Sequence, residues 1–409
     1  MNEQETNRET IAWRGDSRLT EDSLRAHLAT VLRLEHIGVL LGAGASVALG
    51  GKTIQQLWEC FKNQFSRSID TLEEHRLVTQ DDAPNLETLL DTLEVACLEA
   101  DRRHDNHRAD LRRAQLDLRR SVVQASILKS ELWEDSTRRN EIPPDLQDHC
   151  DLLQKLRGAR QPGQPAPWIF TPNYDLAIEW AAEAVGLEVM NGFRGLHNRS
   201  FSPHAFDLGL RNTLARGEAR FGCYEVYLAK LHGSLTWRTV ENATVEEKPA
   251  HALWQGLKAF CDSRSDDFGQ EMVFPSAAKY LHTIGFVLGE LFRRFTDFLN
   301  RPQTALIVNG YSFGDEHLNR ILLSALHNPT LSLVIYAPMA LVTETDVTIP
   351  DDRLALKRLV ALRSPQVTII GNTKRAHFSA LAKDLPDPAI FDDHSRQIRQ
   401  MLKELKEAR

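Results

Sequence analysis

Short apolar runs alternate with amphipathic segments along most of this chain. The runs lack helical spacing and end in glycine or polar residues, as buried strands do. They cover residues 37–41, 168–171, 224–231, 272–274, 305–308, 331–336 and 367–370. Helical periodicity marks residues 21–34, 54–61, 176–184, 281–299 and 316–327. Strands that alternate with helices predict an α/β protein with a Rossmann-like, doubly wound parallel sheet.

The alternation is interrupted by a long stretch of helical periodicity with no strand candidate. We therefore expect a helical subdomain at residues 85–165, inserted into an α/β domain of residues 21–84 and 166–380. The proline- and glycine-rich run at 161–167 ends the insert. The polar segment 1–20 predicts a flexible N-terminus, and the periodicity of 381–409 predicts a C-terminal helix.

Charge and cysteine content narrow the class of protein. The net charge of -7 argues against a broad nucleic-acid-binding face. Seven arginines between residues 102 and 120 are mixed with aspartates, which predicts either an ion-paired, solvated helix face or a phosphate-contacting surface. The five cysteines contain no CxxC pair, so we expect free thiols, neither a disulfide framework nor a zinc site.

The chain begins with a polar segment unlike a signal peptide, and no apolar run approaches about 20 residues. We therefore expect a cytoplasmic protein without a membrane span.

Candidate chemistry lies where the predicted strands end. Four loops, at residues 42–46, 171–175, 230–234 and 310–315, follow strand candidates directly. Ligands of open α/β sheets bind outside the carboxyl ends of the strands, so these loops should converge on one crevice. Gly42 and Gly44 either cradle a phosphate or form a turn between two core elements, and Val47 stands where the dinucleotide fingerprint has its third glycine.

In this order the four loops resemble those of the sirtuin family, and more closely a bacterial branch of sirtuin-like NAD-consuming proteins of anti-phage defence. The resemblance spans roughly residues 34–378. It implies that Asn173, Asp175 and His232 match the family's catalytic positions. It also implies a set of NAD-binding residues: Gly42, Ala43, Gly44, Ser46, Thr171, Tyr174, Gly310, Ser312 and Asp315.

These residue types suit cleavage of a nicotinamide–ribose bond. An asparagine amide orients ribose hydroxyls or water without titrating, a histidine accepts a proton, and a carboxylate favours developing positive charge. Structural roles compete with each assignment. Asn173 could be a turn residue, His232 a satisfied polar residue and Tyr174 a packing residue. Asp315 could cap the helix that follows it instead of binding ribose, and Thr53 could cap its helix instead of contacting phosphate. Lys230 is expected to face solvent at the end of its strand.

The chain departs from deacylase sirtuins in ways that bear on the reaction. It lacks their four zinc-binding cysteines, and a peptide-binding channel cannot be located. Water then becomes the acceptor, which predicts an NAD glycohydrolase that yields nicotinamide and ADP-ribose. The alternatives are a deacylase, an ADP-ribosyltransferase, or a silent NAD or ADP-ribose sensor.

The resemblance further implies a toxic effector of abortive infection, with NAD as substrate and no metal. Such an effector is expected to form a homo-oligomer and to bind a HerA-type ATPase, or alternatively a short Argonaute. Neither direct nucleic-acid contact nor membrane contact is expected.

Overall fold

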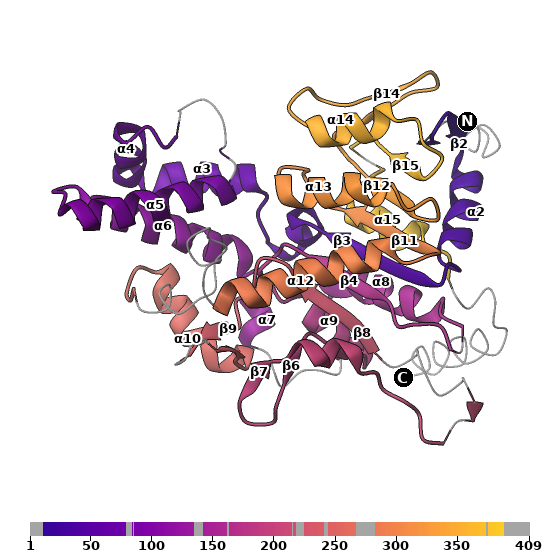
Figure 1. Ribbon diagram of the computed structural model, residues 1–409, viewed down its shortest axis with the longest axis horizontal. Helices are drawn as coiled ribbons and strands as arrows, with labels where there is room; N and C mark the ends of the chain where they lie inside the picture. Colours follow the sequence, from indigo (N-terminus) through magenta and orange to yellow (C-terminus); the bar gives the residue numbers. More distant parts are fainter. Residues whose placement is uncertain are drawn as a thin grey trace.

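A nine-stranded sheet forms the centre of the protein (Figure 1). The computed structural model describes residues 11–78, 84, 86–134, 142–161, 163–214, 216–217, 225–240, 244–266, 283–373 and 375–387. The strands, in spatial order, are β2 (Ser17–Leu19), β1 (Ala12–Arg14), β15 (Val367–Ile370), β12 (Ser332–Tyr336), β11 (Thr304–Asn309), β3 (His36–Leu41), β4 (Trp168–Thr171), β8 (Glu225–Lys230) and β5 (Glu188–Met190).

The sheet is mostly parallel. Every pairing from β15 across to β5 is parallel, whereas β1 pairs antiparallel with both β15 and β2. Within the order β8-β4-β3-β11-β12-β15, the strand that comes first in the sequence is β3, and it lies in the middle. Later strands are added on one side of β3 as far as β8 and then on its other side from β11 onward, as in the 3-2-1-4-5-6 order of a Rossmann sheet. The expected mixed α/β architecture is therefore present and compatible with a Rossmann-like fold.

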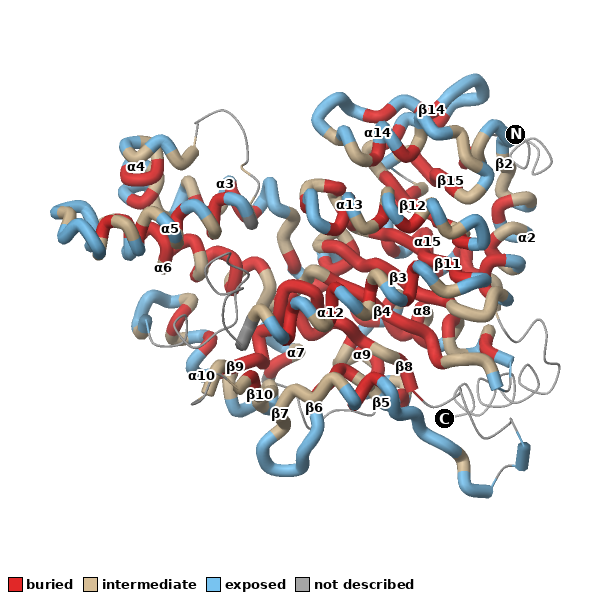
Figure 2. The backbone as a smooth tube through the Cα atoms, viewed as in Figure 1, coloured by how far each residue is buried: buried red, intermediate tan, exposed pale blue. Residues whose placement is uncertain are grey.

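Helices cover both faces of the sheet. One apolar cluster joins the sheet to α12 (Thr283–Asn300), α13 (Glu316–Ala325) and α14 (Leu354–Ala361). The opposite cluster joins it to α2 (Glu21–Val31), α8 (Gln147–Gly158), α9 (Ala177–Val185) and α15 (Phe378–Asp384). Within β3, Leu40 belongs to the first cluster and Leu41 to the second, because neighbouring residues of a strand point to opposite faces. Figure 2 shows that the central strands β12, β11, β3, β4 and β8 are mostly buried.

Four helices form a separate apolar centre that projects to one side of the sheet in Figure 1. They are α3 (Ile54–Gln64), α4 (Ser66–Glu74), α5 (Leu86–Arg103) and α6 (Arg108–Ser126). Trp58 and Phe61 of α3 pack in this centre with Leu93 of α5 and Leu118 of α6. The helical cluster therefore begins before residue 85, while α8, inside the range expected as an insert, packs on α9 and α15 beside the sheet.

The arginines of α5 and α6 are extensively ion-paired, as one of the two interpretations predicted. Arg102 pairs with Glu99, and Arg119 pairs with Glu94 at 2.9 Å. The expectation of a solvated face is wrong for Arg120, whose side chain is fully buried. Its guanidinium contacts Asp117 at 2.7 Å, the carbonyl oxygen of Phe260 at 2.7 Å and Asp266 at 2.8 Å. These contacts fix α6 to the end of α10 (Ala250–Cys261).

Smaller elements complete the described fold. They are a four-stranded sheet of β6 (Phe193–Arg194), β7 (Arg199–Phe201), β10 (Val245–Glu247) and β9 (Trp237–Thr239), a two-stranded sheet of β13 (Leu341–Val342) and β14 (Val347–Thr348), and the short helix α7 (Glu131–Glu134). None of the described helices is long and apolar enough to cross a membrane. The four cysteines within the described residues, Cys60, Cys97, Cys150 and Cys261, are free.

Some expected elements differ from the structure or lie outside it. Residues 12–14 and 17–19 form β1 and the edge strand β2, although a flexible terminus was expected up to residue 20. Pairing of β1 with the distant β15 is a tertiary contact that local polarity does not report. The strand expected at 272–274 and most of the C-terminal helix expected at 381–409 lie outside the described residues.

Candidate functional site

The four candidate loops follow four neighbouring strands. β11, β3, β4 and β8 are adjacent and parallel, so the loops at their carboxyl ends share one edge of the sheet. The loop after β3 contains the 3₁₀ helix η1 (Ala43–Leu49) and faces the loop after β11 across the point where the strand order reverses. This edge is where an open α/β sheet holds its ligand.

Three glycines let the loops after β3 and β11 pack backbone against backbone. A Cβ on Gly42 would lie 2.4 Å from the Gly310 carbonyl oxygen, and one on Gly44 would lie 2.7 Å from the Gly310 Cα. Gly310 itself has a φ of +67°, which favours glycine. The N–H of Gly44 donates to the Gly310 carbonyl at 2.9 Å, and that of Ala45 donates to the Gly42 carbonyl at 3.0 Å. Loop packing by itself therefore accounts for Gly42, Gly44 and Gly310.

Asn173 connects the loops after β3 and β4. Its Nδ2 donates to the Gly42 carbonyl at 3.1 Å and to Ser46 Oγ at 3.3 Å, while its N–H donates to Thr171 Oγ1 at 3.0 Å. Thr171 in turn donates its hydroxyl to the carbonyl of Leu41 at 2.7 Å. Ser46 Oγ donates to Asp175 Oδ2 at 2.7 Å. The structure thus brings together five of the predicted residues in one hydrogen-bonded group.

Lys230 lies beneath this group and is buried, so the expectation that it faces solvent is wrong. Its ammonium donates to the backbone carbonyl of Asp175 and to Glu179 Oε1, the latter at 2.9 Å. Lys230 stands at the last position of β8, directly opposite Thr171 of β4. A buried ammonium needs such partners, and only the tertiary fold places Glu179 of α9 within its reach.

A small polar cavity of about 10 Å³ lies behind the loops and is lined in part by Ser46, Asn173, Asp175, Glu179 and Lys230. His149 of α8 also lines this cavity. Burial lowers the pKa of His149 to about 3, so this imidazole is neutral at physiological pH. The cavity has room for a single water molecule.

His232 is paired with Asp315, which joins the loop after β8 to the loop after β11. His232 Nε2 lies 3.2 Å from Asp315 Oδ2. Burial tends to raise the pKa of Asp315, but the hydrogen bond and positive charge of His232 and two backbone N–H donors outweigh it and lower that pKa. The imidazole also lies beside the Phe292 ring, with centroids 6.1 Å apart. A backbone bond, from the N–H of Leu235 to the carbonyl of Tyr174 at 3.0 Å, connects this loop to the Asn173 loop.

The structural roles considered for the other residues are present. Asp315 caps α13 by accepting from the N–H groups of His317 and Leu318, and Thr53 caps α3 in a capping box with Gln56. Tyr174 is buried in an apolar cluster, as a packing residue would be. Ala43 and Ser312 are partly exposed at the same edge of the sheet.

Sequence reasoning missed Glu179 and His149, which stand inside helices with no motif around them. The spacing from Asp175 to Glu179, one turn apart along the start of α9, was the only signal that placed Glu179 near the loop. His149 had no such signal.

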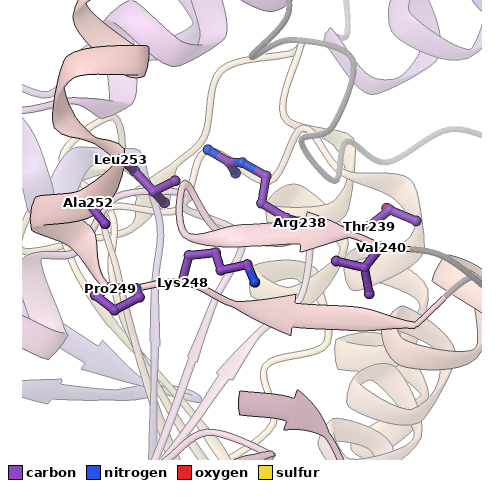
Figure 3. Close-up of a pocket in the computed structure, with 7 residues that line it drawn as sticks. All are labelled: Arg238, Thr239, Val240, Lys248, Pro249, Ala252 and Leu253. Atoms are coloured by element: carbon purple, nitrogen blue, oxygen red, sulfur yellow. The ribbon is translucent and has the colours of Figure 1, made fainter. Parts of the chain in front are cut away.

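A larger cavity, of about 550 Å³, lies away from these loops between β9, β10 and α10 (Figure 3). Arg238 and Lys248 line it together with the apolar side chains of Val240, Pro249 and Leu253. Arg238 donates to the carbonyl oxygens of Leu235 and Trp237, and Lys248 pairs with Glu246 at 2.6 Å. No motif in the sequence marks this cavity.

Among the residues that the structure describes, no group of three or more histidine, cysteine, aspartate or glutamate side chains is arranged to hold a metal ion. The chain matches no protein-family model, and a search of curated proteins likewise found no match.

Proposed function

We propose that the protein is an NAD glycohydrolase that cleaves NAD to nicotinamide and ADP-ribose at the edge of the sheet shared by the four loops. The observation that carries the proposal is the placement of Asn173 and His232. They stand on loops after the adjacent parallel strands β4 and β8, at the same edge of the sheet as the reversal of strand order between β3 and β11. Dinucleotides bind at such a reversal in Rossmann-like sheets. The order of the four loop motifs, which resembles that of sirtuins, supports NAD as the dinucleotide.

Each residue has a role that its contacts suit. The amide Nδ2 of Asn173 donates to Gly42 and Ser46, and we assign its Oδ1 to a ribose hydroxyl or the attacking water. His232 accepts the proton of that water, and the carboxylate of Asp315 favours the imidazolium that forms. Asp175 is held by Ser46 and favours positive charge on the ribose.

The reaction balances with water as the only co-reactant. The glycosidic C–N bond breaks and its electron pair leaves with nicotinamide. A water oxygen bonds to the ribose C1′ carbon, and the proton of that water passes to His232 and then to solvent. No electron is transferred to or from the protein.

The biological setting is part of the same proposal and rests on the resemblance described above. It comprises a cytoplasmic effector of anti-phage defence that forms a homo-oligomer, with a HerA-type ATPase as the partner. The helical insert expected at residues 85–165 is part of the same proposal, either as a lid over the site or as an interface within that assembly.

The test is release of nicotinamide from NAD by the purified protein, alone and with a HerA-type ATPase. Asn173→Ala and His232→Ala are compared with Asn198→Ala and His204→Ala, which replace the same residue types at exposed positions. We expect release by the wild type and the exposed-site controls, and a loss of at least about 100-fold in the two site variants.

Two other results would replace the proposal. Nicotinamide release that requires an acylated or nucleophilic acceptor would identify a deacylase or ADP-ribosyltransferase. Binding of NAD or ADP-ribose without turnover, unchanged by His232→Ala, would identify a sensor.

A further inference from the structure

The backbone of Asp175 is held from below by a charged side chain that the reaction scheme does not use. Lys230 is buried, and its ammonium donates to the Asp175 carbonyl oxygen. The same ammonium donates to Glu179 Oε1 at 2.9 Å. Glu179 lies one helical turn after Asp175, and 20% of its side-chain surface is exposed.

These contacts hold Asp175 from two sides. Its side chain accepts from Ser46 Oγ at 2.7 Å and from the N–H of Ala177 at 3.1 Å, while its carbonyl is fixed by Lys230. Asn173 is two residues earlier in the same loop and has its own bonds to Gly42 and Ser46. The position of the loop therefore depends on the strand that carries His232, because Lys230 and His232 are two residues apart at the end of β8.

We propose that Lys230, oriented by Glu179, is a positioning residue that sets the loop bearing Asn173 and Asp175 relative to His232. The inference rests on the proposed function of that site, since it assigns to Lys230 a role in the same reaction. Lys230 acts through the Asp175 carbonyl and does not contact the substrate.

The chemistry of the pair fits this role better than a simple contribution to stability. A buried ion pair contributes little to stability compared with apolar side chains of equal volume, yet it makes directional, charge-assisted hydrogen bonds. Burial raises the pKa of the Glu179 carboxyl, whereas the adjacent Lys230 charge lowers it. Displacement of a catalytic group by about 1 Å is enough to slow a reaction by about 100-fold.

The test separates position from stability by comparing a single and a double substitution. Lys230→Met leaves Glu179 without its cation and should lower the melting temperature by about 5 °C or more. Lys230→Met combined with Glu179→Leu replaces the pair by apolar side chains and should restore the melting temperature to within about 2 °C of wild type. Both variants lack the donor to the Asp175 carbonyl, so both should release nicotinamide at least about 10-fold more slowly, with KM for NAD changed less than about threefold.

Lys357→Met is the matched control, because Lys357 is an exposed lysine of α14 that is also ion-paired, with Asp351 at 2.5 Å. It should change neither the melting temperature nor the rate of nicotinamide release. Recovery of both stability and rate in the double variant would overturn the proposal and leave the pair a structural role only.

Hydrogen–deuterium exchange of the peptide covering residues 171–177 is the second readout. We expect faster exchange there in the double variant than in the wild type, with no change in the Lys357→Met control. Unchanged exchange would overturn the positioning role. A wild type that releases no nicotinamide would overturn the proposed function, and the exchange comparison would still decide whether Lys230 holds the loop.

Discussion

The hydroxyl of Ser46 donates a 2.7 Å hydrogen bond to Oδ2 of Asp175, and this bond joins the loops that follow β3 and β4. Both residues are buried. Ser46→Ala would leave a buried carboxylate oxygen without this donor, and we expect the free energy of unfolding to fall by about 1.5–3 kcal/mol. Urea denaturation measures the change. Ser130→Ala, at a serine whose hydrogen bond is exposed, should change it by less than about 0.5 kcal/mol. Equal effects at the two sites would contradict the importance of the bond.

The close approach of Gly42 to Gly310 predicts a steric effect. The Cβ in Gly42→Ala would lie 2.4 Å from the Gly310 carbonyl oxygen, so a loop has to shift and stability should fall by about 2 kcal/mol or more. Gly289→Ala is the control, because nothing lies within 4 Å of its Cβ position in the middle of α12. That substitution should raise the free energy of unfolding by about 0.5–1 kcal/mol, since alanine favours a helix. Thermal or urea unfolding distinguishes the two signs.

The pairing of Asp315 with His232 predicts a pH dependence of stability. Burial acts to raise the pKa of Asp315, but the hydrogen bond and charge of His232 and the N–H donors of Leu318 and His317 lower it overall. A lowered carboxyl pKa stabilises the folded state above the unfolded pKa of about 4, and that stability is lost as the pH falls through the folded pKa. Asp315→Asn keeps a capping oxygen but not the charge. Its deficit in urea stability should be largest near pH 6 and shrink toward pH 3, whereas a deficit constant over this range would refute the assignment.

His149 should cause a second loss of stability in acid, over a different pH range from that of Asp315. Its pKa is lowered by burial from 6.5 to about 3, so the unfolded chain binds a proton that the folded chain does not. Stability should therefore decrease as the pH falls from about 6.5 toward 3, by up to a few kcal/mol. His149→Phe keeps a ring against Phe378, whose centroid lies 4.3 Å away, and removes the titration.

We expect this variant to lose less stability than the wild type between pH 6.5 and 4. The exposed-site variant His204→Phe should follow the wild-type profile. Parallel profiles for His149→Phe and the wild type would show that another group governs the acid response.

Arg120 predicts the largest loss of stability among the arginines of α6. Arg120→Met would remove one of the two arginines that pair with the buried Asp117, the other being Arg113 at 3.2 Å, together with the bonds to Phe260 and Asp266. We expect the free energy of unfolding to fall by about 2–4 kcal/mol. Arg102→Met, at an exposed arginine of α5 paired with Glu99, should cost less than about 1 kcal/mol. Comparable costs in urea unfolding would mean that burial of Arg120 does not matter.

The local pattern of apolar and polar residues was sufficient to predict an element where one or both of its faces are buried in the core. The apolar runs predicted β3, β4, β8, β11, β12 and β15, because central parallel strands are apolar on both sides. Amphipathic spacing likewise predicted α2, whose Leu24, Leu28 and Val31 are buried. Cap chemistry predicted Thr53 as an N-cap and gave N-capping as an alternative role for Asp315, since a cap depends only on residues within one helical turn.

The same local pattern failed where a contact joins distant segments. The strands β1 and β2 have three residues each, and β1 lies against β15 more than 350 residues away in the register Ala12 to Ile370. Lys230 ends a strand, where a charged residue ordinarily reaches solvent, yet α9 covers it with Glu179. Burial lowers the pKa of His149 to about 3, and its ring lies against Phe378, a residue far away in the sequence.

By itself the sequence determined the class of fold, the strands that form its centre and the four loops at their carboxyl ends, because periodicity and turn residues are local properties of a chain. Only the tertiary structure decided which neighbours those loops have. It packed Gly42 against Gly310, paired His232 with Asp315, and buried Lys230 between Asp175 and Glu179. Such contacts depend on strand order and on how helices cover the sheet, and these are set by the simultaneous burial of many distant apolar side chains.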